Sequence, residues 1–161
     1  MRKKILNPLT MLLSGLILGV LSRLFDIYFE NLGNIFSEMA IWILIGTLIS
    51  IYSETKREAM LNVLLFCLGM LVTYYATAII TKGVYSKTFI IGWTIFALCS
   101  PLMAFLAWMS KESGVWPTII SAGIVIVSVL SSVILFDGPR IYDFVIDGIL
   151  IYFLFFVKIN R

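Results

Sequence analysis

Histidine is absent from this chain of 161 residues, and only two cysteines are present. Without histidine there is no Ser-His or Cys-His relay and no His-rich zinc or haem site. Cys67 and Cys99 lie inside apolar runs without a CxxC spacing, which favours small packed residues over a disulfide or redox pair. A Gly-rich phosphate loop and a GxGD protease motif are also missing. No cofactor is expected, and paired carboxylates are the one remaining source of catalytic chemistry.

Charge is scarce as well, since charged residues make up 13% of the chain and apolar residues 61%. Soluble domains carry about 25% charged residues. A water-soluble fold of this length cannot hide so much apolar surface, so the expected surroundings are a lipid bilayer. The net charge of +3 fits flanks that contact anionic lipid headgroups, and it does not imply a nucleic-acid partner.

Six apolar runs have the length of about 17 to 25 residues that crosses the hydrocarbon core of a bilayer. Short polar or turn-forming clusters separate them, and no long linker is visible. The predicted spans are 5–25, 35–52, 59–80, 88–109, 116–136 and 141–157. We therefore predict an all-α integral membrane protein, in which residues 1–161 form a single compact bundle of about six transmembrane helices.

The Lys and Arg residues predict the orientation of this bundle. Eight of the twelve fall on one side: Arg2, Lys3, Lys4, Lys56, Arg57, Lys111, Lys158 and Arg161. Six of the nine acids fall on the other: Asp26, Glu30, Glu38, Asp137, Asp143 and Asp147. Basic loops stay in the cytoplasm, so both termini are predicted to be cytoplasmic and the outer end acidic, in a multi-pass protein of the cell membrane.

Two similar octapeptides hold most of the charges expected near or within the membrane. They are Arg23-Leu-Phe-Asp26-Ile-Tyr-Phe-Glu30, which closes span one, and Arg140-Ile-Tyr-Asp143-Phe-Val-Ile-Asp147, which opens span six. In each, the charges recur at i, i+3 and i+7 and so share one stripe of a helix. We expect spans one and six to touch near their outer ends, with an arginine of one stripe facing carboxylates of the other.

Charge at membrane depth is costly unless it is paired or hydrated, which leaves two interpretations of these stripes. They form an Arg-carboxylate network that only holds span one against span six, or they line an outward-facing site for a polar or cationic small molecule. Glu38, at the start of span two, enters from the same acidic side. Asp147 lies deepest in its apolar helix and is expected to take up a proton or bind a cation. No particular metal is indicated.

Two further patterns concern packing. Thr73, Thr77 and Thr81 recur at i, i+4 and i+8 in span three; they offer hydrogen bonds to a ligand, but such hydroxyls more often bond their own helix or a neighbour, which we favour. Gly15 and Gly19 form a small-xxx-small face in span one. This face lets another helix approach closely, either within the bundle or from a partner protein.

Three segments carry a resemblance to known proteins. They are Gly15-Leu-Ile-Leu-Gly19-Val-Leu-Ser-Arg23-Leu-Phe-Asp26, Trp42-Ile-Leu-Ile-Gly46-Thr-Leu-Ile-Ser-Ile-Tyr52-Ser and Asn62-Val-Leu-Leu-Phe-Cys-Leu-Gly69-Met. Over roughly its first half the chain resembles a family of small bacterial multi-span membrane proteins to which no function is assigned. In size, span count and inside termini it is also similar to the substrate-binding subunits of energy-coupling-factor vitamin transporters. That likeness implies capture of a small molecule from outside, and a coupling subunit docked on Gly15 and Gly19.

The sequence therefore predicts a small integral-membrane transport or ligand-binding protein. Its predicted acidic site lies between spans one, two and six and contains Arg23, Asp26, Glu30, Glu38, Arg140, Asp143 and Asp147. The alternative is a non-catalytic immunity, sensor or accessory subunit that binds a membrane protein partner, in which the charged network is structural. An enzyme acting through the outer carboxylates is the weakest of the three readings.

Overall fold

The computed structural model describes residues 6–83 and 86–159 of the chain, with the side chain of Glu30 outside the description. Within this part, all regular structure is helical, as predicted. The helices are α1 (Pro8–Tyr28), α2 (Glu30–Ser37), α3 (Met39–Tyr52), α4 (Lys56–Ile80), α5 (Lys87–Met109), α6 (Val115–Leu135), α7 (Ile141–Ile151) and a closing π-helical turn, η1 (Tyr152–Phe156).

Local sequence sets where several helices begin and end. Asn7 caps α1: its Oδ1 accepts a hydrogen bond from the backbone N–H of Thr10 at 3.0 Å, and Pro8 follows at the first helical position. Thr55 caps α4 in the same way, with its hydroxyl 3.2 Å from the N–H of Glu58. At η1, the last turn of the chain, Lys111 donates from Nζ to the carbonyl oxygens of Leu154 and Val157, each at 2.8 Å. A cation thus satisfies carbonyls that the end of a helix leaves unpaired.

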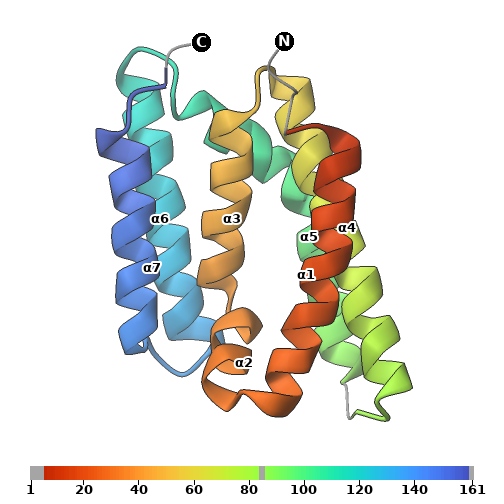
Figure 1. Cartoon of the computed structure of the whole chain (residues 1–161). Helices are drawn as coiled ribbons and strands as arrows, with labels where there is room; N and C mark the ends of the chain where they lie inside the picture. Colours follow the sequence, from red (N-terminus) through yellow and green to blue (C-terminus); the bar gives the residue numbers. More distant parts are fainter. Residues whose placement is uncertain (1–5, 84–85, 160–161) are drawn as a thin grey trace.

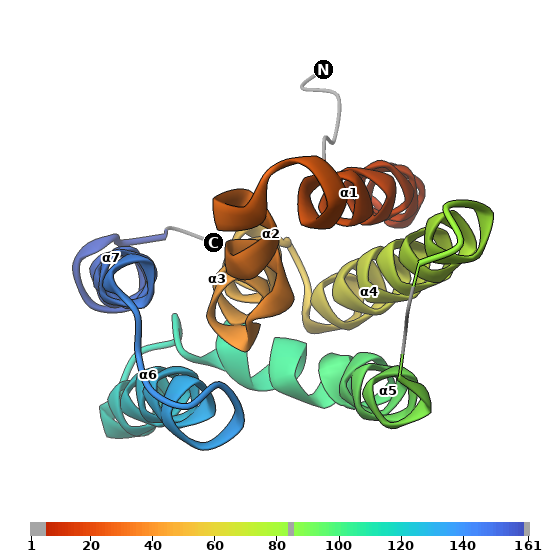
Figure 2. The same ribbon diagram turned by 90° about the horizontal axis from the view of Figure 1, so that it is seen from below.

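Helix α3 stands in the middle of the bundle (Figure 1). Views from the side and from below place α1, α4 and α5 on one side of it and α6 and α7 on the other (Figures 1 and 2). The start of α1 and the end of η1 lie at the same end of the bundle. We call this the termini end, and the opposite end, where α2 lies, the α2 end.

Several helices are long and apolar enough to cross a membrane, which supports a multi-pass membrane protein. They are α1, α4, α5 and α6, and the bent pair α2–α3 makes a fifth span if it crosses as one unit. The predicted sixth span is divided, because α7 has 11 residues and passes into the five-residue turn η1. The described helices therefore give four or five candidate spans, and the predicted count of six is not confirmed.

The predicted span 35–52 is broken at Glu38. This residue is extended (φ −93°, ψ 157°) between the end of α2 and the start of α3, which meet at a bend of 63°. Trp42 of α3 donates its indole N–H to the carbonyl oxygen of Phe36 at 2.8 Å, so a carbonyl freed near the end of α2 gains a donor. The chain therefore turns at Glu38, and this residue is buried in the bundle with only 1% of its surface exposed.

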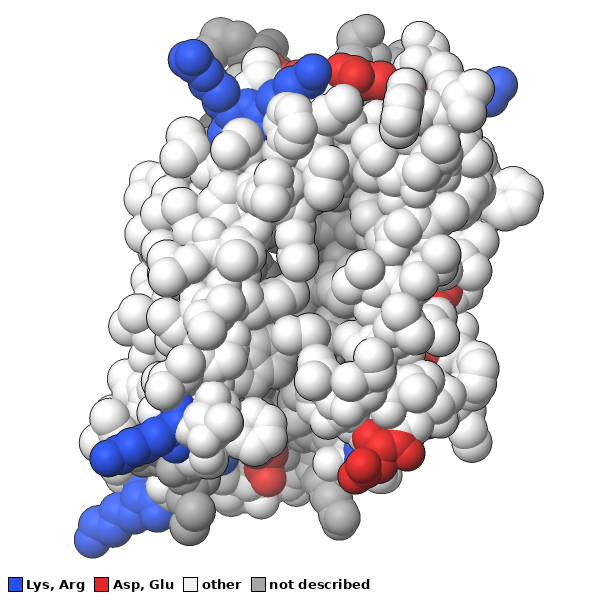
Figure 3. All heavy atoms as spheres, turned by 180° about the vertical axis from the view of Figure 1, so that it is seen from behind, with Lys and Arg blue, Asp and Glu red and all other residues white. Residues whose placement is uncertain are grey.

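Most charged side chains on the face in Figure 3 lie at the two ends of the molecule, and the band between them is largely uncharged, apart from acidic atoms visible at its right edge. Large apolar side chains are exposed on the bundle, among them Ile17 at 62%, Leu98 at 63% and Ile126 at 56%. A soluble monomer rarely exposes apolar patches of such extent. Such a surface is the one that lipid tails would cover.

Glycines close the seam between α1 and α4. A Cβ atom at Gly15 would overlap the carbonyl oxygen of Phe66, and one at Gly19 would overlap that of Met70. Gly69 of α4 packs equally closely against α1, since a Cβ at Gly69 would lie 2.8 Å from the carbonyl oxygen of Leu12. Of the two uses open to Gly15 and Gly19, the structure shows packing within the chain. Helix α4 covers this face, which therefore gives no support to a docked coupling subunit.

Replacing Gly15 by alanine should lower the thermal stability of the protein, because the added methyl group meets backbone atoms of α4. Overpacking of this kind costs about 1–3 kcal/mol. Gly92→Ala in α5 is the matched control, since a Cβ at Gly92 meets nothing within 4 Å. Thermal unfolding in detergent should show a loss for Gly15→Ala alone. Equal melting temperatures for the two variants would contradict the tight seam.

Candidate functional site

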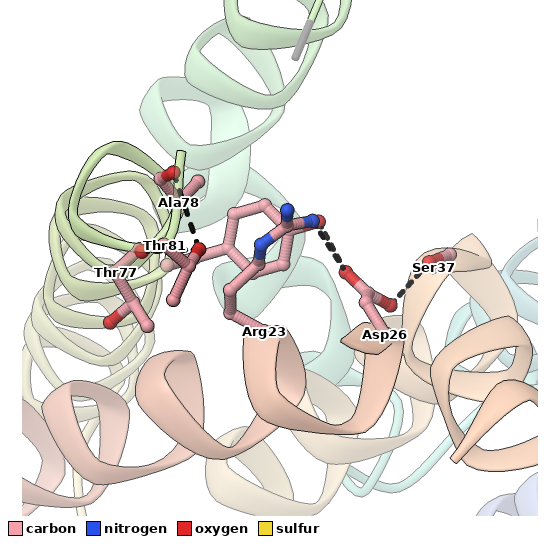
Figure 4. Close-up of polar contacts among 7 residues, drawn as sticks. Arg23, Asp26, Ser37, Thr77, Ala78 and Thr81 are labelled. Carbon is pink, nitrogen blue, oxygen red and sulfur yellow. Dashed lines mark hydrogen bonds and ion pairs between the residues drawn. The ribbon is translucent and has the colours of Figure 1, made fainter. Parts of the chain in front are cut away.

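The first octapeptide forms a cluster at the α2 end, which we call the Asp26 cluster: Arg23, Asp26, Ser37 and Tyr74. Arg23 and Asp26, one turn apart on α1, approach to 3.7 Å between Nη1 and Oδ2. The Asp26 carboxylate also accepts hydrogen bonds from the hydroxyl of Tyr74 at 2.5 Å and of Ser37 at 3.2 Å. Figure 4 shows Asp26 between Arg23 and Ser37. One carboxylate therefore joins α1, α2 and α4.

Threonine hydroxyls near this cluster bond helix backbone. Thr73 donates to the carbonyl oxygen of Leu16 in α1 at 2.7 Å, and Thr81 donates to that of Thr77 at 2.8 Å. Figure 4 shows Thr77 and Thr81 on α4, near Arg23. For Thr73 and Thr81 the favoured interpretation, bonding to their own helix or a neighbour, is confirmed.

A second cluster, the Glu38 cluster, joins the α2–α3 break to α7 through Glu38, Arg140, Tyr142 and Asp143. Glu38 Oε1 accepts a hydrogen bond from the Tyr142 hydroxyl at 2.7 Å and lies 3.2 Å from Arg140 Nη1. Arg140 also donates to the Tyr142 oxygen at 2.7 Å. The Arg140 side chain is 48% exposed and that of Glu38 only 2%. The pair thus runs from the surface into the bundle.

The two acids of the second octapeptide, Asp143 and Asp147, are buried along α7. Asp143 Oδ2 accepts the backbone N–H of Arg140 at 2.8 Å, so this carboxylate caps the start of its own helix. Asp147 Oδ1 accepts a hydrogen bond from the hydroxyl of Ser128 in α6 at 2.6 Å. Asp147 is 8% exposed and Ser128 is fully buried. This bond holds α7 against α6.

The expected direct contact between the two stripes is wrong in its geometry. Arg23 pairs with Asp26 of its own helix, Arg140 pairs with Glu38, and α3 stands between α1 and α7 in both ribbon views (Figures 1 and 2). The link runs through the α2–α3 break instead, because Ser37 bonds Asp26 and the next residue bonds α7. The predicted role of the Glu30 side chain lies outside the described residues.

The buried carboxylates outnumber the arginines near them, and hydroxyl groups supply their other hydrogen-bond donors. Tyr74 and Ser37 bond Asp26, Tyr142 bonds Glu38, and Ser128 bonds Asp147. Sequence reasoning missed these partners because it matched acids only with bases. One signal was present: Ser121, Ser128 and Ser132 recur at i, i+7 and i+11 on one face of α6, and all three are buried.

An aromatic pocket of about 280 Å³ lies beside the Asp26 cluster, with walls from α2, α3, α4 and α5. Seven aromatic side chains line it: Phe36, Trp42, Tyr74, Tyr75, Phe89, Trp93 and Phe136. Ser37 and Tyr74 also line this pocket, and both bond the Asp26 carboxylate. The Asp26 carboxylate therefore lies directly behind the Ser37 and Tyr74 side chains of the pocket wall.

A second cavity of about 310 Å³, the apolar cavity, lies between α3, α4, α5 and α6. Its lining is mostly apolar and includes the buried hydroxyls of Thr47, Ser50 and Ser100. Figure 3 shows the molecule hollowed along the middle of one face, between its charged ends. Trp42 lines both cavities and so forms a common wall.

Among the described residues, no group of three or more Asp, Glu or Cys side chains could hold a metal ion. A family model matches residues 1–146, a range that includes the Asp26 and Glu38 clusters. The chain belongs to the DUF6518 family. This is a family of unknown function. No curated protein and no solved structure matches the DUF6518 chain, so the likeness to energy-coupling-factor subunits gains no support.

Removing the hydroxyl of Ser128 should destabilise this DUF6518 protein, because Asp147 then keeps a buried carboxylate without that donor. A buried group left unsatisfied costs about 1–3 kcal/mol, and more if it is charged. Ser131→Ala on the same helix is the control, since its hydroxyl bonds the Ser128 carbonyl of its own helix. Thermal unfolding should show the larger loss for Ser128→Ala, with partial rescue by Asp147→Asn. Equal losses in both serine variants would contradict the α6–α7 bond.

Proposed function

We propose that this protein is a small integral-membrane ligand-binding or transport protein, with six passes, cytoplasmic termini and an outward-facing α2 end. The excess of Lys and Arg in the predicted inner loops supports the orientation. Four of those residues, Arg2, Lys3, Lys4 and Arg161, lie outside the described part of the chain. The start of α1 and the end of η1 lie at the termini end, which supports an even number of passes (Figure 1).

The ligand class we propose is a small organic cation with an apolar body, and the observation that carries it is the aromatic pocket. Ring faces attract cations, most strongly where water is excluded, and quaternary ammonium groups are recognised in this way. Behind Ser37 and Tyr74, the Asp26 carboxylate offsets the positive charge of Arg23, with which it pairs, so this wall of the pocket does not repel a cation. A volume of about 280 Å³ suits a small ligand.

A route inward from the pocket supports transport over binding alone. Trp42 lines both the aromatic pocket and the apolar cavity, so the two spaces share a residue. A ligand with an apolar body would exchange ring contacts in the first cavity for aliphatic contacts in the second. Movement of the Trp42 indole would connect the two cavities.

The second candidate is a membrane interaction subunit without a ligand, in which the charged groups only hold helices together. The observation in its favour is the supply of partners within the chain. Asp26, Glu38 and Asp147 each accept a hydrogen bond from a hydroxyl of another helix, so these bonds hold helices together without a ligand.

Benzyltrimethylammonium should bind the purified protein and change its tryptophan fluorescence, because Trp42 and Trp93 both line the aromatic pocket. The uncharged tert-butyl analogue should bind more weakly, and Trp93→Leu should weaken binding of the cation. A cation–π contact contributes about 0.5–2 kcal/mol, which corresponds to roughly 2- to 30-fold in affinity. Trp116→Phe is the control, since Trp116 is 73% exposed and lines neither cavity.

Asp26→Asn should also weaken binding of the cation, since it removes the negative charge behind the pocket wall. Asp147→Asn tests the deeper acid along α7. If neither substitution changes binding while both variants stay folded, the carboxylates are structural and the interaction subunit becomes the better account. Equal affinity for the cation and its uncharged analogue would contradict a cation site even if the pocket binds both.

An impermeant maleimide added outside intact cells should label Lys87→Cys and not Ser113→Cys, in a background without Cys67 and Cys99. Both positions are exposed, Lys87 at the start of α5 and Ser113 in the connection between α5 and α6. Permeabilised cells provide the control, because both cysteines should then react. The reverse pattern in intact cells would overturn the proposed orientation.

A further inference from the structure

Two carboxyl oxygens at the α2 end are buried without a hydrogen-bond partner among the described residues: Oε2 of Glu38 and Oδ1 of Asp143. Glu38 is 1% exposed and Asp143 is fully buried. Arg140 joins the two side chains: its guanidinium lies 3.2 Å from Glu38 Oε1, and its backbone N–H donates to Asp143 Oδ2 at 2.8 Å. Buried polar atoms nearly always have a partner, so two oxygens without one at the same junction require an explanation.

The other oxygen of each carboxyl is already in use. Glu38 Oε1 takes the Tyr142 hydroxyl and the Arg140 guanidinium, and Asp143 Oδ2 takes the backbone N–H of Arg140. What remains between the two side chains is a pair of acceptors with no donor. Neither oxygen can satisfy the other unless a hydrogen atom lies between them.

The charges around the pair lead to the same conclusion. Arg140 provides one positive charge for two carboxyl groups, and its side chain is half exposed to the surroundings. The other titratable groups near the pair are Tyr142, whose hydroxyl donates a hydrogen bond to Glu38, and Asp147, one turn further along α7. On the α2 side, Ser37 bonds Asp26, whose charge is met by Arg23. Two ionised carboxylates side by side at such burial would repel each other, and one of them takes up a proton.

We infer that Glu38 and Asp143 form a proton-binding site and hold one proton between their two unpartnered oxygens. The shared proton removes one negative charge, gives each oxygen a partner, and ties the α2–α3 break to the start of α7. With Arg140 it brings the net charge of the cluster to zero. Loss of the proton would place two like charges at this junction and weaken the connection. The inference does not depend on the ligand proposed for the aromatic pocket.

The test is infrared difference spectroscopy of the purified protein across pH, which detects the C=O stretch of a protonated carboxyl group. The wild type should show this band at neutral pH and lose it at high pH. Glu38→Gln and Asp143→Asn should each abolish it, while Asp147→Asn and the exposed Asp137→Asn should leave it in place. Both amides keep the carbonyl oxygen that Tyr142 or the Arg140 N–H requires, so the fold should survive.

Thermal stability provides a second measurement. If the folded protein holds a proton that the unfolded chain releases, stability must fall as pH rises through the range where that proton leaves. Glu38→Gln replaces the shared proton by a permanent N–H donor and should flatten this dependence, whereas Asp137→Asn should not. Absence of the infrared band at neutral pH would overturn the proposal. So would a band that persists in both Glu38→Gln and Asp143→Asn, or one that only Asp147→Asn removes.

Discussion

Lipid offers no hydrogen bonds, and that constraint explains most of the polar contacts in this bundle. A buried polar side chain therefore depends on partners within the chain. Several serine and threonine hydroxyls meet this need locally by bonding helix carbonyls, as Ser53 does with Ile49 at 2.7 Å. The carboxylates meet it across helices. They therefore decide which helices are held together at the α2 end, whereas apolar packing and glycine contacts decide how closely the others approach.

The broken segment α2–α3 is the point at which these cross-helix contacts meet. Ser37 reaches Asp26 on α1, and Glu38 reaches Tyr142 and Arg140 beside α7. Two adjacent residues thus connect the two groups of helices that stand on either side of α3. The DUF6518 match extends over both contacts, so the break belongs to the part of the chain that defines its family membership. A straight helix across this segment would carry Ser37 and Glu38 away from at least one of these partners.

Composition and run length predicted the helical class, four of the long helices and the glycine seam. These follow from apolar length and from the absence of a Cβ, which are properties of a single segment. Three features required knowledge of neighbours. At the bend, Glu38 accepts a hydrogen bond from Tyr142, which is 104 residues away. The partner of Asp147 is a serine of another helix, and the division of the last span into α7 and η1 has no marker such as proline in the sequence. A prediction that paired acids only with bases therefore placed the two octapeptides in direct contact. In the structure they are linked through the α2–α3 break.

The hydrogen bond between Trp42 and the Phe36 carbonyl has a mechanical consequence. The indole belongs to α3, yet its N–H donates to a carbonyl of α2, and Trp42 contributes to the lining of both cavities. A change in the angle between α2 and α3 would therefore require the indole to move with α2 or to lose this hydrogen bond. Movement of the indole would alter the lining of both cavities at once.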